Sequence, residues 1–82
     1  MTKAEVMRIL REANPGRPYE VLVRYADAFL LYLEAEENIR RNGAITAHPR
    51  TGAPLENPYL QVRNQASKIL ASIRLKTEGL WR

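Results

Sequence analysis

The chain has 82 residues, a formal net charge of +4 and no cysteine. A domain of this size buries only about 60 to 65 percent of its unfolded surface, so a partner subunit would add stability that its own core lacks. Disulfides and thiolate metal sites are excluded, and the single histidine, His48, cannot form a zinc site alone. No apolar run approaches the about 20 residues of a membrane span. We therefore expect a soluble protein of a reducing cytoplasm, with no signal peptide and no membrane contact.

Positive charge is concentrated in the two flanks of the chain. The charged side chains sum to +2 over residues 1–24, to −2 over residues 25–43 and to +4 over residues 44–82. A basic excess alone is weak evidence for a polyanionic partner. The acidic middle between two basic flanks is more informative than the total.

A first helix is predicted from Thr2 to about Ala13. Thr2 and Glu5 have the spacing of a capping box, in which each side chain satisfies a backbone donor near the other. The segment 14–16, Asn-Pro-Gly, ends this helix because proline disfavours helical geometry in the residue before it. The apolar residues that recur on one face are Val6, Ile9, Leu10 and Ala13.

A second, long helix is predicted from Arg17-Pro18 to about Asn42, a length of roughly 37 Å. Two apolar stripes lie side by side on it, which exceeds the usual single stripe of a surface helix. We expect part of this surface to contact another subunit. The residues expected there are Leu22, Phe29, Tyr32, Leu33 and Ile39. Pairs at the i, i+4 spacing should support the exposed side: Glu20–Arg24, Glu36–Arg40 and Glu37–Arg41.

A short β-hairpin is predicted at about residues 44–56. Gly43 suits the end of the long helix, and the segment 49–52, Pro-Arg-Thr-Gly, has the composition of a tight turn. Strands are expected at 44–47 and 53–55. Because a two-stranded hairpin alone is marginal in water, it should lean on helices or on a neighbour's hairpin. Ile45 and Leu55 are therefore added to the expected subunit interface.

A third helix is predicted to begin at Asn57-Pro58, with Asn57 as its N-cap, and to end at about residues 77–79. A short tail, residues 78–82, follows. Its Leu80 and Trp81 either anchor a partner surface or fold back over the third helix. The predicted fold is thus mainly α: one domain over residues 1–82, with three helices, a long central helix and a short β-hairpin between helices 2 and 3.

The order of motifs from Glu37 to Leu80 resembles the small subunits of tailed-phage DNA-packaging terminases. In that family a helix ending in Asn-Gly leads into a two-stranded turn and then into Asn-Pro-x-Leu at the start of a helix. The matching residues are Asn42-Gly43, Ala44-Ile45-Thr46, Pro49-Arg50-Thr51-Gly52, Asn57-Pro58-Tyr59-Leu60, Asn64, Ala66 and Lys68.

The resemblance implies a helical protein that forms ring-like oligomers. It also implies binding to the packaging site on double-stranded phage DNA and delivery of that DNA to the large terminase subunit, which holds the ATPase and the nuclease. The expected location is the cytoplasm of the bacterial host cell.

Catalytic and cofactor sites are not expected. There is no Gly-rich phosphate loop of the Walker type and no assembled set of nucleophile, acid, base or metal ligands. Glu34, Glu36 and Glu37 point in different directions on a helix, so we interpret them as a solvated salt-bridge face. His48 and Arg50 lie at the hairpin tip, where each is either an exposed side chain or a contact to DNA or a subunit.

DNA contact, if direct, should be electrostatic. Asn64 and Gln65 could read adenine, although polar residues on a helix flank are ordinary. The basic residues expected to contact DNA are Arg50, Arg63, Lys68, Arg74 and Lys76.

Two alternative functions stay open at this point. The chain could be a satellite-encoded homologue that joins the helper phage's small terminase subunit and redirects packaging. It could also be a stand-alone basic helical module that binds DNA or bridges proteins, although that interpretation leaves the order of motifs from residue 43 to residue 70 unexplained.

Overall fold

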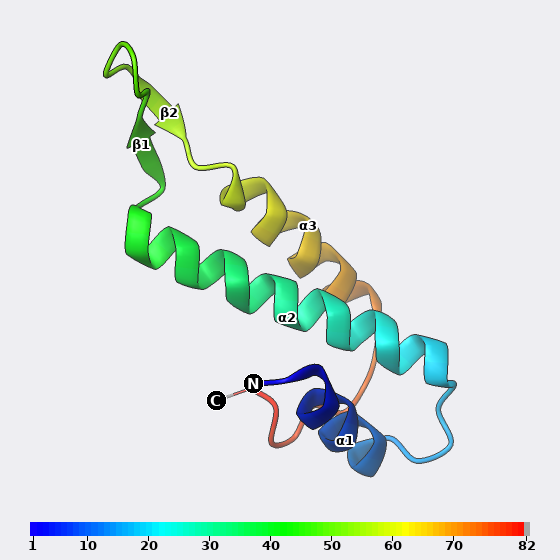
Figure 1. Ribbon diagram of the computed structural model, residues 1–82. Helices are drawn as coiled ribbons and strands as arrows, with labels where there is room; N and C mark the ends of the chain where they lie inside the picture. The colour runs from blue at the N-terminus through cyan, green and yellow to red at the C-terminus, as the bar shows by residue number, and fades with distance from the viewer. Residues whose placement is uncertain (82) are drawn as a thin grey trace.

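A computed structural model describes residues 1–81 and shows an elongated molecule of 54 × 21 × 17 Å. The long helix α2 is its spine, α3 packs antiparallel along α2, and α1 crosses the opposite side of α2 (Figure 1). The hairpin projects beyond the helices at one end. This arrangement confirms the predicted fold class. The elements in chain order are α1 (Lys3–Ala13), α2 (Tyr19–Asn42), β1 (Ile45–Ala47), β2 (Pro54–Glu56) and α3 (Tyr59–Ser72).

Helix α1 begins with the predicted capping box. The Glu5 backbone N–H donates to Thr2 Oγ1 at 3.2 Å, and the Thr2 backbone N–H donates to Glu5 Oε1 at 3.1 Å. The second bond favours the ionised carboxyl and lowers the pKa of Glu5. Val6, Met7 and Leu10 on the inner face of α1 are buried against α2.

Helices α2 and α3 approach each other through small side chains. Ala28 and Ala35 of α2 and Ala66 of α3 are almost completely buried. Alanine has no atoms beyond Cβ, so it lets two helix backbones come close and pack along their length. Gly43, with φ of +84°, ends α2 as predicted, because that backbone conformation is rarely adopted by other residues.

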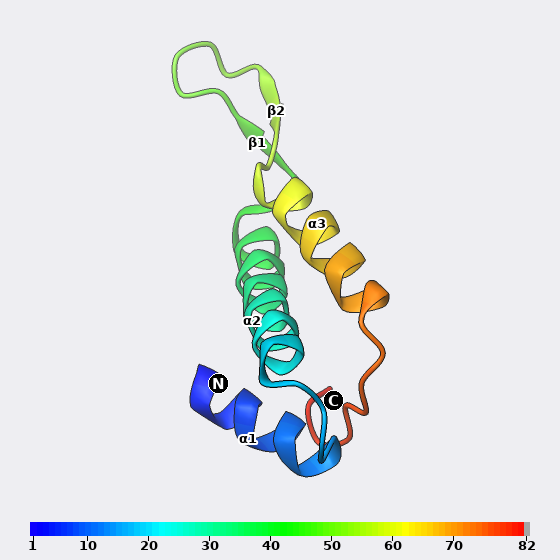
Figure 2. The same cartoon turned by 90° about the vertical axis from the view of Figure 1, so that its right-hand side faces the viewer.

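Helix α3 ends at Ser72, several residues before the predicted end at 77–79. The Ser72 hydroxyl donates to the Ile69 carbonyl at 2.7 Å, and Ile73 adopts extended geometry. Asn14 then binds both backbone groups of Lys76: its Nδ2 donates to the carbonyl and its Oδ1 accepts from the N–H, each at 2.7 Å. These bonds replace those that a continuing helix would have made. The segment from Ile73 to Lys76 therefore runs extended toward α1 (Figure 2).

The C-terminal tail folds back onto α1 and α2 instead of covering α3. Leu80 is buried in the core cluster between α1 and α2. Trp81 packs edge to face on Phe29, with ring centroids 4.6 Å apart, and on Tyr32 at 5.6 Å. Its Nε1–H also donates to the Tyr25 hydroxyl at 3.1 Å. The prediction that the tail folds over the third helix is therefore wrong, and its role as an anchor for a partner stays a prediction.

We predict that Trp81→Ala lowers the free energy of unfolding by about 2 kcal/mol, because it removes two aromatic contacts and a hydrogen bond from a ring that is partly exposed. Urea denaturation followed by circular dichroism measures the change. Trp81→Phe keeps a ring and should lose less. An unchanged stability together with weaker self-association would instead place this ring in a subunit contact.

Candidate DNA-binding and subunit-contact surfaces

The hairpin of residues 44–56, here called the arm, stands apart from the helical body. Ile45 pairs with Glu56, Thr46 with Leu55 and Ala47 with Pro54 in an antiparallel ladder. Ile45 is 61% exposed and Leu55 is 42% exposed, so neither is covered by the helices. Of the two supports expected for the arm, helices of its own subunit do not cover these side chains, and the hairpin of a neighbour stays a prediction. Two strands with exposed apolar side chains are marginal in water, so the arm gains little stability from its own apolar residues.

Asn57 fixes the base of the arm. Its side chain is buried and its Nδ2 donates to Asn38 Oδ1 at 3.0 Å and to the Gly43 carbonyl at 2.9 Å. Its Oδ1 accepts from the Tyr59 N–H at 3.0 Å, the predicted N-cap contact, although α3 as assigned begins one residue later than expected. One amide thus connects the end of α2, the arm and the start of α3, and orients the arm relative to the helices.

The basic residues predicted to contact DNA do not form one surface. Arg50 is exposed in the turn of the arm, at the far end of the molecule. Arg63 is half-buried and its Nη1 lies 3.4 Å from Glu36 Oε1 on α2, so part of its charge is compensated. Lys68 is exposed on α3. The polar candidates Asn64 and Gln65 are exposed on the same helix.

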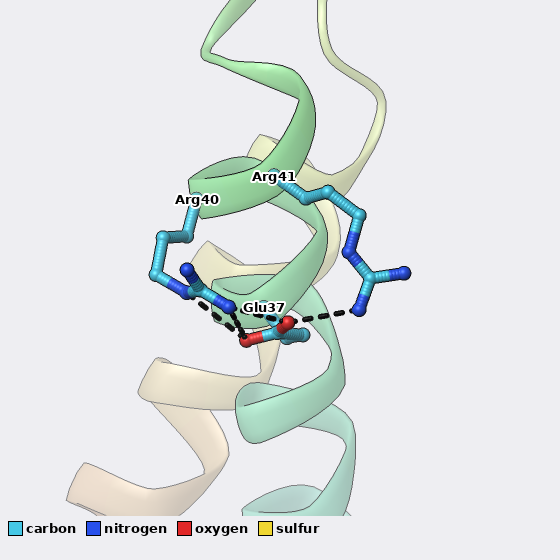
Figure 3. Close-up of polar contacts among 3 residues, drawn as sticks. All are labelled: Glu37, Arg40 and Arg41. Atoms are coloured by element: carbon cyan, nitrogen blue, oxygen red, sulfur yellow. Dashed lines mark hydrogen bonds and ion pairs between the residues drawn. The ribbon is translucent and has the colours of Figure 1, made fainter.

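The end of α2 carries two further arginines whose charge is partly compensated by one carboxylate. Arg40 and Arg41 both direct a guanidinium group at Glu37, with shortest N···O distances of 2.6 and 2.9 Å (Figure 3). Hydrogen bonds from Arg40 first and from Arg41 second lower the pKa of the Glu37 carboxyl. The predicted Glu37–Arg41 pair is confirmed, whereas the predicted Glu36–Arg40 pair is wrong because Arg40 turns to Glu37. Within the described residues 1–81, no ion pair joins Glu20 to Arg24, so that prediction is wrong as well.

At the opposite end of the molecule, Arg74 and Lys76 lie beside the α1–α2 turn. Together with Arg17 of that turn they line an open hollow of about 770 Å³, which Tyr25 and Thr77 also border. Sequence reasoning treated Arg17 only as the start of the second helix. The sequence could not predict that Arg17 lies beside Arg74 and Lys76, because the contact between Asn14 and Lys76 that brings them together joins positions 62 residues apart.

The residues predicted for a subunit interface fall into two groups. Leu22, Phe29 and Leu80 are 3%, 2% and 3% exposed within the single chain, so they have almost no surface left for a partner. They belong to the monomer core, and we remove them from the expected interface. The residues that keep exposed or half-exposed surface are Tyr32, Leu33, Ile39, Ile45, Leu55 and Trp81.

No helix of residues 1–81 is long and apolar enough to cross a membrane. Within the same range, no three His, Asp or Glu side chains lie together in a way that could hold a metal ion.

The structure thus defines a small, mainly α-helical protein with a cluster of basic residues at one end and a projecting hairpin at the other. The family model described as phage terminase, small subunit, matches residues 5–76. The chain therefore belongs to the phage terminase small subunit family, which confirms the resemblance seen in the sequence. Members of this family are in general non-catalytic, DNA-binding components of the packaging machinery. Comparisons with curated proteins and with solved structures gave no significant match.

We predict that Asn57→Ala lowers the free energy of unfolding by about 2 to 3 kcal/mol, because it leaves the Gly43 carbonyl, the Asn38 amide and the Tyr59 N–H without their partner. Urea denaturation measures the loss, and limited proteolysis should show faster cleavage in the arm. Asn38→Ala, which removes one of the three contacts, is the matched control and should cost less. Equal stability of wild type and Asn57→Ala would contradict the assigned role.

Proposed function

We propose that this chain is a terminase small subunit that self-associates, binds the packaging site on phage DNA and presents that DNA to the large terminase subunit. The observation that carries the proposal is the family match over residues 5–76. The same match favours packaging over a stand-alone basic module. In this proposal the protein acts in the cytoplasm of the bacterial host, where the phage genome is packaged.

Self-association is supported by apolar side chains that the monomer leaves uncovered. Ile45 and Leu55 project on the arm, and Leu31 and Leu33 are 41% and 38% exposed on α2. An apolar hollow of about 480 Å³ lies beside Leu31, bordered by Val23 and by Ile69 of α3. Side chains of this size each contribute about 1.5 to 3 kcal/mol when they become fully buried. A second copy of the chain is the partner we propose for them.

Contact with the large subunit follows from family membership and has no assigned surface in this chain. In this proposal the large subunit hydrolyses ATP and cleaves DNA, and the small subunit binds and selects the DNA. A single arm fixed by a buried amide is suited to this role, because it presents the same residues in the same direction from every subunit.

Self-association is the first test. We expect the wild-type protein to be larger than a monomer at micromolar concentration by light scattering with size-exclusion chromatography. Ile45→Asn together with Leu55→Asn should weaken association by about tenfold for each buried side chain lost. Helix content measured by circular dichroism is the internal control, because neither residue belongs to the monomer core. A wild-type protein that stays a strict monomer, alone and with a phage small terminase subunit, would contradict the assembly part of the proposal.

The second test concerns catalysis. The purified chain should neither hydrolyse ATP nor cleave DNA, because its sequence has no Walker-type phosphate loop. Addition of the large subunit should supply both activities. Turnover by the small subunit alone, surviving further purification and scaling with its concentration, would show that a site had been overlooked.

A further inference from the structure

The end of the molecule where α1 meets α2 gathers basic side chains from three separate stretches of the chain. Arg11 lies near the end of α1, Arg17 in the following turn, and Arg74 and Lys76 in the extended segment after α3. Arg11 and Arg17 line one hollow, and Arg17, Arg74 and Lys76 line the next. No Asp or Glu side chain lines either hollow. We call these four residues the basic end.

Within residues 1–81, the four cations of the basic end have no ion-pair partner. By contrast, Lys3 on α1 lies 3.0 Å from Asp27 and Arg8 pairs with Glu12. The arginines at the other end of α2 are held by Glu37. Four exposed cations close together repel one another, so a bound anion would relieve that repulsion.

The backbone directs Arg74 and Lys76 to the same side. Residues 73, 75 and 77 are half-buried and residues 74 and 76 are exposed, which is the alternation of an extended strand. Their Cα atoms are therefore about 7 Å apart on one face. Asn14 fixes this register by binding both backbone groups of Lys76 from the α1–α2 side, where Arg17 lies.

From this geometry we infer that the basic end binds the phosphate backbone of double-stranded DNA. A small anion could satisfy only one or two of the four cations, whereas a DNA strand carries a charge about every 3.4 Å along its axis and offers a phosphate to each. Arginine and lysine on an open surface contact phosphates without reading bases. The inference rests on the proposed function and assigns the DNA contact to the basic end instead of the arm or the outer face of α3.

The test measures binding of a labelled random-sequence duplex to the assembled full-length protein between about 50 and 200 mM salt. Arg17→Ala with Arg74→Ala should weaken binding by about tenfold or more and reduce the slope of log affinity against log salt by about 1.8, because each phosphate contact contributes about 0.9. Adding Lys76→Ala should reduce the slope further. The matched control is Arg40→Ala with Arg41→Ala, which removes the same number of guanidinium groups from a site where both already pair with Glu37.

The salt dependence of the variants distinguishes DNA binding at the basic end from DNA binding elsewhere. An unchanged slope in the Arg17/Arg74 variant, with normal binding by wild type, would overturn the assignment and leave the proposed function standing. Equal losses in the variant and in its control would also overturn it, because net charge alone would then explain the effect. No DNA binding by wild type would count against both. Light scattering on the variant must match wild type, since a loss of assembly would identify the basic end as a subunit contact.

Discussion

Two hydrogen bonds between the Asn14 side chain and the Lys76 backbone hold the segment after α3 against the end of α1. No proline or glycine lies between Ser72 and Thr77 to stop α3, so these two bonds act together with the local bond from the Ser72 hydroxyl to the Ile69 carbonyl. With them, the segment from Ile73 to Lys76 is extended and brings Leu80 into the core beside α1. The Asn14 amide thus adds a C-terminal residue to a core that Val6, Met7 and Leu10 of α1 already form with α2.

The second buried amide, Asn57, has the equivalent role at the other end of the molecule. Each amide offers both donor and acceptor groups, so one side chain can satisfy several backbone groups where two elements separate or converge. Among the described residues, no buried side-chain nitrogen or oxygen lacks a hydrogen-bond partner. The apolar contacts hold the helices together, and the two amides determine which way the arm and the C-terminal segment leave them.

Much of the fold follows from local sequence. The capping box at Thr2 and Glu5, the glycine after α2 and the Asn-Pro at the start of α3 each act through neighbouring residues, and these boundaries were predicted within a residue or two. The early end of α3 could not be predicted, because its cause lies 62 residues away. The site shows the same limit: Arg74 and Lys76 were identified singly, but their position beside Arg17 depends on the fold. The burial of Leu22 and Phe29 within one chain could not be predicted either, because an apolar stripe does not show whether its own chain or a partner covers it.

Pro54 removes a backbone hydrogen-bond donor from the outer edge of β2. The Asn57 N–H donates to the Ala44 carbonyl and the His48 N–H donates to the Ala53 carbonyl. In this register the backbone N of residue 54 points away from β1, toward the outer edge of the hairpin. A residue with an N–H there would offer a donor to a further strand, and proline offers none. The outer edge of β2 is therefore blunted, while the outer edge of β1 keeps its donors and acceptors. The arm therefore has one weaker and one stronger edge for the addition of a strand, an asymmetry that limits the growth of an extended sheet from its tip.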